Sequence, residues 1–235
     1  MGSHVRIDIL TVFPNMLRGF LEESMVKRAV QMGAVQINVV DLRDFAHDSR
    51  RTLDDRPFGG GPGMIMKPEP LFEAVETLRT NETRVILMSP AGKQFNQQEA
   101  RSLTAQGHLL IVCGHYEGVD ERVIEAHVTD ELSIGDYVLT NGALPAAVVT
   151  DAVVRLLPGV LGGGEEATAD ESFSTSLLEH PQYTRPPVYR GMAVPAVLQN
   201  GNHPEIAAWR RRRALDRTTR RRPDLLVPPA HQPIS

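Results

Sequence analysis

Three short polar segments, each placed where a predicted strand ends, contain residue types that often bind small ligands. They are residues 89–92, 114–118 and 133–142, and each contains at least one glycine. In open α/β sheets, ligands bind beyond the carboxyl ends of the strands, where glycines let backbone groups approach and loops supply polar side chains. The segments could equally be plain connections between elements, and composition alone leaves both interpretations open. If they bind a ligand, one shared pocket is the expected arrangement.

Other residue types that commonly carry catalysis give weaker signals. The single cysteine, Cys113, ends an apolar run, where a buried structural thiol is the common case, and one thiol cannot form an internal disulfide. The eight histidines lack the spacing of a helical zinc site, so no metal cage is expected. The chain has neither a G-x-G-x-x-G after its first strand nor a G-x-x-x-x-G-K-[ST] segment, which disfavours a dinucleotide fold and a phosphate-binding NTPase loop.

A cluster of glycines at residues 59–63 is by itself a weak signal, because glycine clusters usually mark turns. Charged residues precede it at 54–56, and the apolar and basic residues 64–67 follow it. These flanks favour a functional loop over a purely structural turn.

The elements that would position these loops alternate between strand and helix. Short, nearly continuous apolar runs indicate parallel strands buried on both faces, so we expect an α/β fold with a mostly parallel sheet and helices on both faces. The helix expected at 144–157, with Pro145 in its first turn, is apolar almost all round and should be buried, with Arg155 near its end. The predicted strands are 6–13, 35–40, 85–88 and 109–112, and the other predicted helices are 17–32, 70–79, 97–106 and 120–127.

Length and composition are those of an ordinary globular protein: 235 residues, 41% hydrophobic and 23% charged. No run approaches eighteen apolar residues, and no secretory leader is evident, so we expect a cytoplasmic protein with no membrane partner. The net charge of −4 first argues against a nucleic-acid partner. However, eight arginines lie between Glu205 and Asp224 against three acidic residues, so the C-terminal end is basic and the rest of the chain acidic. Such a basic end can be a solvated helix face or can bind a polyanion.

The chain is expected to have two domains. Glycine and glutamate dominate the segment after residue 160, as in flexible linkers. We therefore place a domain at 1–160, a linker at 161–175 and a second, helical domain at 176–235. Asn202 followed by Glu205 resembles a capping box that begins a short helix in the second domain.

Six segments in order along the chain resemble the bacterial tRNA (guanine-N1)-methyltransferases of the SpoU-TrmD class. Each is weak alone, but six in family order are highly specific. The resemblance implies a C-terminal trefoil knot in the first domain, a tRNA-binding second domain and a homodimer. The six segments are residues 6–14, 55–64, 114–118, 133–139, 155–162 and 183–186.

The resemblance further implies methyl transfer from S-adenosylmethionine to N1 of guanosine 37 of tRNA, next to the anticodon, a modification that protects the reading frame. Glu117 and Asp136 would contact the ribose hydroxyls or the sulfonium end of the donor, in roles that the sequence does not rank. Mg²⁺ is a candidate cofactor by the same resemblance. The residues expected to bind the donor are Leu87, Ser89, Pro90, Gly114, Tyr116, Glu117, Ser133, Ile134, Gly135, Asp136, Tyr137, Val138, Leu139, Gly142 and Pro145.

The acceptor needs a base, because N1 of neutral guanine carries a proton and is a poor nucleophile. By the resemblance, Asp170 would remove that proton and Arg155 would stabilise the charge that develops at O6. In the family, the essential aspartate adjoins a Ser-Phe pair, whereas here Glu171 adjoins Ser172. Glu171 is therefore a rival for the role of base.

Two other function classes compete with an RNA methyltransferase. One is an RNA-binding module that keeps the fold but binds no donor, and the other is a nucleotide-dependent enzyme of ordinary doubly wound type. Donor binding separates the first of these from the enzyme.

Overall fold

The computed structural model describes residues 5–162 and 171–227, and its contacts divide the chain into two compact units, Met1–Gly164 and Glu165–Ser235. Each unit is described by itself. The predicted linker, 161–175, falls mostly outside the described residues. In the part of the chain that is described, no helix is both long and apolar enough to cross a membrane.

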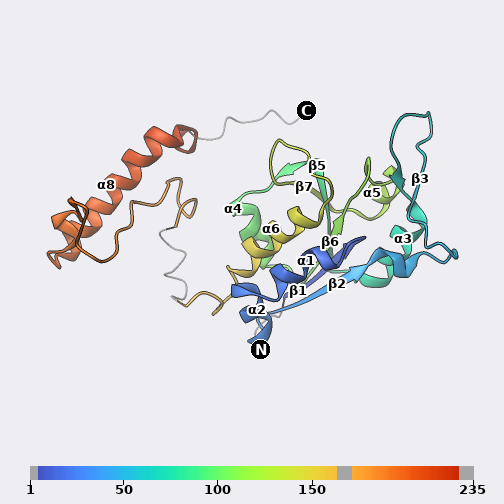
Figure 1. Ribbon diagram of the computed structural model, residues 1–235, viewed down its shortest axis with the longest axis horizontal. Helices are drawn as coiled ribbons and strands as arrows, with labels where there is room; N and C mark the ends of the chain where they lie inside the picture. The colour runs from blue at the N-terminus through green and yellow to red at the C-terminus, as the bar shows by residue number, and fades with distance from the viewer. Residues whose placement is uncertain (1–4, 163–170, 228–235) are drawn as a thin grey trace. The chain divides into compact units, whose positions relative to one another are not determined.

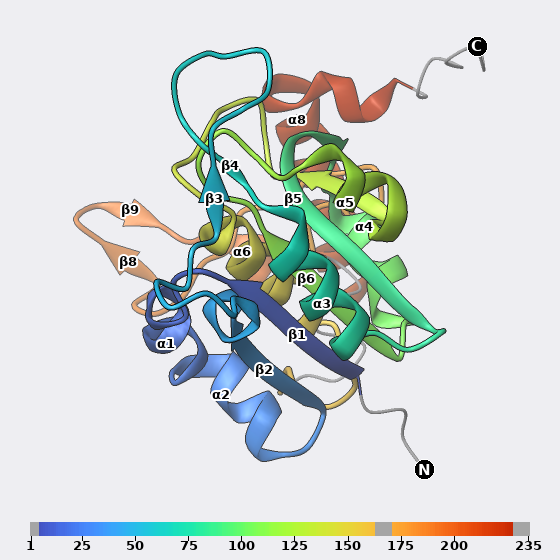
Figure 2. The ribbon, with the colours of Figure 1, turned by 90° about the vertical axis from the view of Figure 1, so that its right-hand side faces the viewer.

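The first unit is built on a five-stranded sheet in the order β2-β1-β6-β5-β7 (Figure 1). Every pairing between neighbours in it is parallel. The prediction of an α/β fold with a mostly parallel sheet is thus confirmed. The strands are β1 (Val5–Thr11), β2 (Val35–Asp41), β5 (Thr83–Gln94), β6 (His108–Cys113) and β7 (Asp130–Ser133). Figure 2 shows β1 beside β2 in this sheet.

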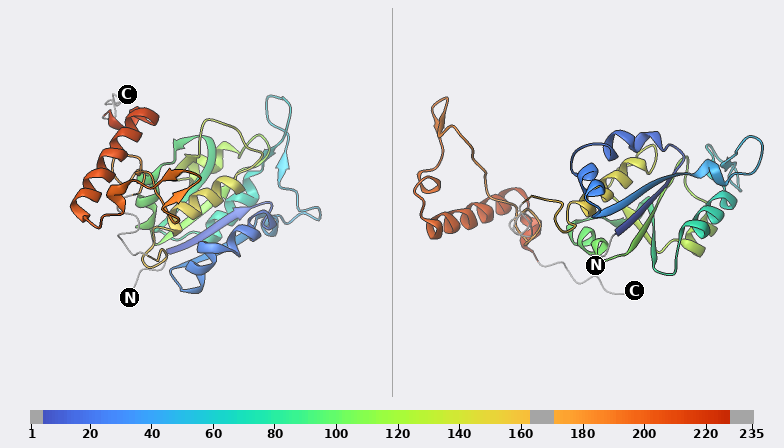
Figure 3. Two further views of the ribbon diagram at one scale, coloured as in Figure 1. Left: turned by 60° about the vertical axis from the view of Figure 1, so that its left-hand side comes forward. Right: turned by 90° about the horizontal axis from the view of Figure 1, so that it is seen from below.

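Helices cover both faces of the sheet, as the right-hand view of Figure 3 shows. On one face, α6 contacts α1, α2 and α4, while on the other α3 contacts α5 and a 3-10 turn, η1. The helices are α1 (Asn15–Leu21), α2 (Ser24–Gln31), α3 (Pro68–Leu78), α4 (Gln97–Thr104), α5 (Glu121–His127) and α6 (Ala143–Val154), and η1 spans Leu42–Phe45.

The central position of strand β6 in the sheet explains why its sequence is a continuous apolar run. Leu109, Ile111 and Cys113 enter the core on the α6 face, whereas Leu110 and Val112 enter the core on the α3 face. Successive side chains of a strand point to opposite faces, so a strand covered on both sides needs apolar residues throughout.

The helix predicted at 17–32 is wrong as a single element, because the chain forms α1 and α2 instead. Ser24, the first residue of α2, has φ 54°, so α1 cannot continue through it into α2 as one right-handed helix. The pattern concealed the break because Leu21 and Met25 lie on either side of it at helical spacing, and both pack against the same core. Helix α6 begins at Ala143, next to its predicted start, but it ends at Val154, before the predicted end at Leu157.

The second unit contains a small hairpin, β8 (Val188–Tyr189) with β9 (Met192–Ala193), and one long helix, α8 (His203–Arg221). The turns η2 (Ala196–Leu198) and η3 (Pro223–Leu226) flank this helix in the sequence. The predicted N-cap is confirmed, because the Asn202 side chain accepts a hydrogen bond from the backbone N–H of Glu205. The reciprocal half of the capping box is wrong: the Asn202 N–H donates to the Asn200 side chain, and the Glu205 carboxylate accepts from the Asn200 amide instead. At 19 residues, the helix is longer than the short one expected.

Candidate active site

A cavity of about 620 Å³ lies at the carboxyl ends of β5, β6 and β7. It is lined by all the residues predicted to bind the donor except Asp136, whose side chain is exposed outside it. Three loops, one after each of two strands and one within β5, form its walls. That the lining residues bind S-adenosylmethionine stays a prediction.

The first wall is a bulge in β5. Ile86–Met88 pair with Asp130–Leu132, and pairing resumes at Lys93 and Gln94, so residues 89–92 leave the ladder and reach the cavity. Gly92 closes the bulge against the backbone of β7: a Cβ there would lie 2.4 Å from the carbonyl carbon of Glu131. Only glycine allows this approach.

The second wall, residues 114–118, follows β6 and is held from outside by the segment after the glycine cluster. Glu117 N–H donates to the Met64 carbonyl at 3.0 Å, and Met66 N–H donates to the Gly118 carbonyl at 2.9 Å. Gly63 lies so close to Glu117 that a Cβ would be 2.2 Å from its Oε1. The glycine-rich loop therefore ends directly behind a carboxylate that lines the cavity. A turn with a purely structural role would not need to pack against the cavity wall.

Two short strands form the base of that outer segment, β3 (Asp54–Asp55) and β4 (Ile65–Met66), which pair antiparallel. Tyr116, on the cavity wall, has φ 58°. Burial, together with the negative charge of Asp54, raises the pKa of the Tyr116 hydroxyl. Tyr116 is therefore neutral at physiological pH and can act as a hydrogen-bond donor.

The third wall, residues 133–142, returns across the end of β6. Gly142 N–H donates to the Gly114 carbonyl at 2.8 Å, and His115 Nδ1 lies 2.9 Å from the Thr140 carbonyl oxygen. Tyr137, Val138 and Leu139 are all exposed on this wall, Val138 by 81%. They form an apolar surface beside backbone groups, which suits a flat heteroaromatic ring.

Acidic side chains complete the lining: Glu117, Glu121 and Glu131. A cavity with an apolar wall and carboxylates suits a ligand that combines an aromatic base, hydroxyl groups and a positive centre. Cys113 is not a nucleophile here, because burial raises the pKa of its thiol to about 12 and keeps it protonated.

Sequence reasoning missed Val119, Glu121, Ile124, Glu131 and Leu132 among the lining residues. Val119 precedes α5, Glu121 and Ile124 lie in α5, and Glu131 and Leu132 lie in β7. The strand β7 was not predicted because its four residues, Asp130–Ser133, begin with two acids and present no apolar run. The one signal was that the segment just after it, 133–142, looked like a loop at a strand end.

Arg155, predicted to act in catalysis, is not among the residues that line this cavity. Arg155 caps the C-terminus of α6, where its N–H donates to the Asp151 carbonyl at 3.1 Å, and it is half-buried. Asp170 lies outside the described residues. Its rival Glu171 is described, in the second unit, where its carbonyl accepts the Ser174 hydroxyl at 2.7 Å. The identity of the base therefore stays a prediction.

Metal binding finds no ligand set in residues 5–162 and 171–227: no three His, Cys, Asp or Glu side chains there could hold an ion together. Mg²⁺, predicted as a candidate cofactor, has no assigned ligands.

Comparison with known proteins relates nearly the whole chain to one family. The model of the family "tRNA (Guanine-1)-methyltransferase TrmD" matches residues 5–228. A protein of Moorella thermoacetica named tRNA (guanine-N(1)-)-methyltransferase is 58% identical over 227 residues, covering 95% of this chain and 90% of the relative. Proteins with the same name from Lacticaseibacillus paracasei and Geobacillus kaustophilus are 57% and 54% identical, covering 94% of this chain and 87% and 91% of the relatives. The resemblance of the six segments is confirmed, and the chain belongs to the TrmD family of tRNA (guanine-N1)-methyltransferases.

Proposed function

We propose that this protein transfers the methyl group of S-adenosylmethionine to N1 of guanosine 37 in tRNA, forming N1-methylguanosine. The observation that carries the proposal is the cavity at the ends of β5, β6 and β7. Its lining includes every predicted donor-binding residue but one, in a chain that is 58% identical to a named methyltransferase. S-Adenosylmethionine is the methyl donor that a member of this family uses.

The donor fits the cavity by chemistry. The apolar residues 137–139 offer a surface for adenine, and the neighbouring backbone offers donors and acceptors for its edge. The carboxylates of Glu117 and Glu131 can accept ribose hydroxyls or face the cationic sulfonium and ammonium groups. Once donor and acceptor are aligned, methyl transfer from a sulfonium needs little further catalysis.

The remaining chemistry concerns the guanine. A carboxylate at Asp170, or at Glu171, removes the N1 proton, and the electron pair left on N1 attacks the methyl carbon as its bond to sulfur breaks. The Arg155 guanidinium stabilises the negative charge that spreads to O6. S-Adenosylhomocysteine and the protonated carboxyl are the other products, so protons and charge balance.

The tRNA would contact helix α8. Arg210–Arg213, Arg220 and Arg221 are exposed on it and Arg222 is exposed at its C-cap, and the Arg213 guanidinium lies 5.7 Å from the centre of the Trp209 ring. A cavity of about 420 Å³ in the same unit is lined by Arg213, Arg217 and other residues of this helix. Clustered arginines bind phosphates and give an affinity that falls with salt.

We also propose that the family's trefoil knot is present and that it shapes the donor cavity. Two close backbone approaches support this proposal: Gly92 against Glu131, and Gly142 against Cys113. The first joins the bulge of β5 to the neighbouring strand β7, and the second joins the segment after β7 to the end of β6, two strands away in the sheet. The division into a donor-binding domain, a linker at 161–175 and a tRNA-binding domain is part of the same proposal.

The proposed reaction is tested by transfer of a labelled methyl group to two tRNA transcripts that differ only in carrying G or A at position 37. We expect label only in the G37 transcript, mapped to N1 of that base, because adenine offers no equivalent N1–H and O6 pair. Equal labelling of both transcripts would refute the base-specific chemistry. Donor binding without transfer to either transcript would favour the RNA-binding module instead.

A homodimer is proposed from an apolar stripe on α6. Leu144 and Val148 are 54% and 47% exposed, four residues apart on one face of a helix whose other faces are in the core. Nearby Met16 of α1 is also exposed, and its sulfur lies 3.6 Å from the Asn141 amide nitrogen. Exposed apolar patches of this kind mark interfaces, and a second copy of this chain is the partner that the family implies.

We expect Val148→Glu to convert the dimer to a monomer, because it places a charge in the centre of the apolar stripe. Light scattering after size-exclusion chromatography measures the mass directly. Val30→Glu on α2 is the matched control, since Val30 is 42% exposed on another helix. A wild-type protein that is monomeric at all concentrations would contradict the proposal, as would a Val148→Glu protein that stays dimeric.

A further inference from the structure

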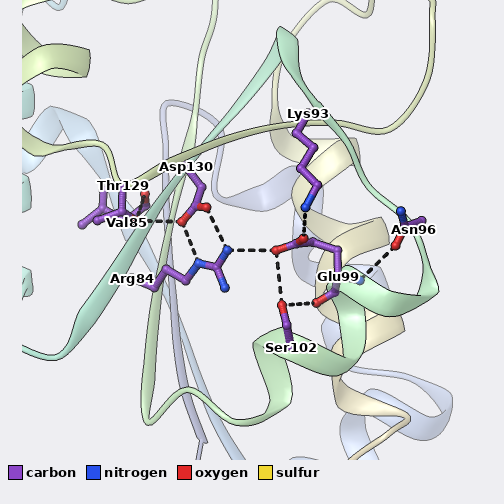
Figure 4. Close-up of polar contacts among 8 residues, drawn as sticks. All are labelled: Arg84, Val85, Lys93, Asn96, Glu99, Ser102, Thr129 and Asp130. Carbon is purple, nitrogen blue, oxygen red and sulfur yellow. Dashed lines mark hydrogen bonds and ion pairs between the residues drawn. The ribbon is translucent and has the colours of Figure 1, made fainter. Parts of the chain in front are cut away.

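Four charged side chains bracket the bulge of β5 that forms the first wall of the donor cavity (Figure 4). Arg84 precedes the bulge on β5 and Lys93 follows it, while Glu99 is on α4 and Asp130 begins β7. None of the four lines the cavity itself. The proposed reaction mechanism uses none of them.

The centre of this cluster is the Glu99 carboxylate. Its Oε1 accepts a hydrogen bond from Arg84 Nη2 at 2.8 Å, and its Oε2 accepts one from Lys93 Nζ at 2.7 Å. Arg84 in turn donates to both oxygens of Asp130, at 2.6 and 2.8 Å. The two cations on either side of the bulge are therefore held by one carboxylate.

Glu99 is itself fixed to its helix. Its backbone N–H donates to the Asn96 side chain at 3.0 Å, which caps α4, and the Ser102 hydroxyl donates to the Glu99 carbonyl oxygen at 2.9 Å. Its side chain is only 8% exposed. A buried carboxylate that is anchored at its backbone and paired with two cations can hold them in a fixed geometry.

Charge in the cluster is balanced, with two cations against two anions. The hydrogen bond from Lys93 is the main factor that lowers the pKa of Glu99, and the hydrogen bonds from Arg84 lower the pKa of Asp130. Both carboxylates therefore stay ionised at physiological pH, and the contacts with Arg84 and Lys93 persist.

Lys93 has a position that an ordinary surface ion pair lacks. Its side chain is 69% exposed, so the pair adds little to stability as such. However, Lys93 is the first residue after the bulge, next to Gly92, whose backbone abuts Glu131. A movement of the downstream end of residues 89–92 would carry Lys93 away from Glu99.

We propose that Glu99, through Lys93, is a positioning residue for the methyl donor: it holds the loop of Ser89, Pro90 and Ala91 in the conformation that binds S-adenosylmethionine. This inference rests on the proposed function, since it assigns the donor to this cavity. A loop held in its binding conformation before the ligand arrives binds more tightly, because less freedom is lost on binding.

The test uses the full-length protein with Lys93→Met, which keeps the length of the side chain and removes the charge. We expect the Kd for S-adenosylmethionine, measured by calorimetry, to rise about fivefold, as for loss of one partly exposed charged contact. The KM for the donor should rise in parallel. In contrast, kcat at saturating donor and the KM for tRNA should stay within about twofold, because the lost contact stabilises the bound donor equally in the ground state and in the transition state. Lys93→Arg should restore donor affinity.

Lys27→Met is the matched control, an exposed lysine on α2 outside the cavity lining. Unchanged donor affinity in Lys93→Met, or an equal loss in Lys27→Met, would overturn the inference. So would a fall in kcat with unchanged KM for the donor. Glu99→Gln gives a second test, in which donor affinity should fall at least as far as in Lys93→Met. If the wild-type protein binds no S-adenosylmethionine, the proposed function itself fails, which is a distinct result.

Discussion

Asp170→Asn is expected to lower the rate of methyl transfer about 1,000-fold, within the range that a positioned general base contributes. The amide of Asn cannot accept the N1 proton of guanine. Guanine deprotonated at N1, which is the nucleophile, is therefore rarely formed. Donor binding should be unchanged, since no predicted donor contact involves this residue. Single-turnover transfer of labelled methyl to G37 tRNA, with donor affinity measured by calorimetry, gives both quantities.

Glu171→Gln is the matched control for this experiment, because it makes the same chemical change one residue later in the chain. We expect it to keep most of the activity. If Glu171→Gln loses the activity and Asp170→Asn keeps it, the assignment of the base is wrong and Glu171 holds that role.

The pH profile adds a second criterion. Guanine N1 loses its own proton at alkaline pH, so the rate with Asp170→Asn should climb with pH and approach that of wild type. A variant that merely distorts the site would stay slow at every pH. Lack of any rescue at alkaline pH would therefore contradict the role of Asp170 as a base.

The parts of the fold that the sequence predicts are the elements whose burial is indicated by the order of apolar and polar residues within the element itself. Strand β6 was predicted because every residue from Leu109 to Val112 is apolar, and the structure buries them on both faces. Strand β7 was not predicted, because its place depends on pairing with β5 and on the contact of Asp130 with Arg84, 46 residues away. A short strand fixed by distant partners has no local signature.

The candidate site divides in the same way. Its loops could be predicted, because glycines and polar residues follow the apolar runs of buried strands. The charged cluster around Glu99 could not, since Arg84, Lys93 and Glu99 look like ordinary surface residues in the sequence. Nor does the sequence show which glycines are needed because another segment packs closely against them. Gly107 and Gly142 cannot be distinguished in the sequence, but of the two only Gly142 has a neighbouring backbone that would clash with an added Cβ.

That difference leads to a second large effect, for Gly142→Ala. The added Cβ would lie 2.7 Å from the Cys113 Cα, a distance that real Cβ atoms essentially never show, and 3.0 Å from the Gly114 nitrogen, which is tighter than most real Cβ contacts. Both neighbours are backbone, so no side chain can rotate to make room. The φ of Gly142 is −80°, which alanine adopts freely, so the cost is steric and not conformational.

The third wall must therefore move away from the end of β6, and the 2.8 Å hydrogen bond from Gly142 N–H to the Gly114 carbonyl is lost or stretched. We expect the free energy of unfolding to fall by about 1–3 kcal/mol, as for other overpacked sites. The affinity for S-adenosylmethionine should fall at least about tenfold, because two walls of its cavity meet at this contact. Thermal unfolding and calorimetry measure the two effects.

Gly107→Ala is the control, since a Cβ at Gly107 would meet no atom within 4 Å and its φ is ordinary. It should leave stability and donor binding close to wild type. Gly142→Ala with normal donor affinity would show that the meeting of the second and third walls is not needed for the cavity to bind its ligand. In that case the donor must be held by the β5 bulge and by residues 114–118 alone, and the proposed contribution of residues 137–139 to adenine binding would be wrong.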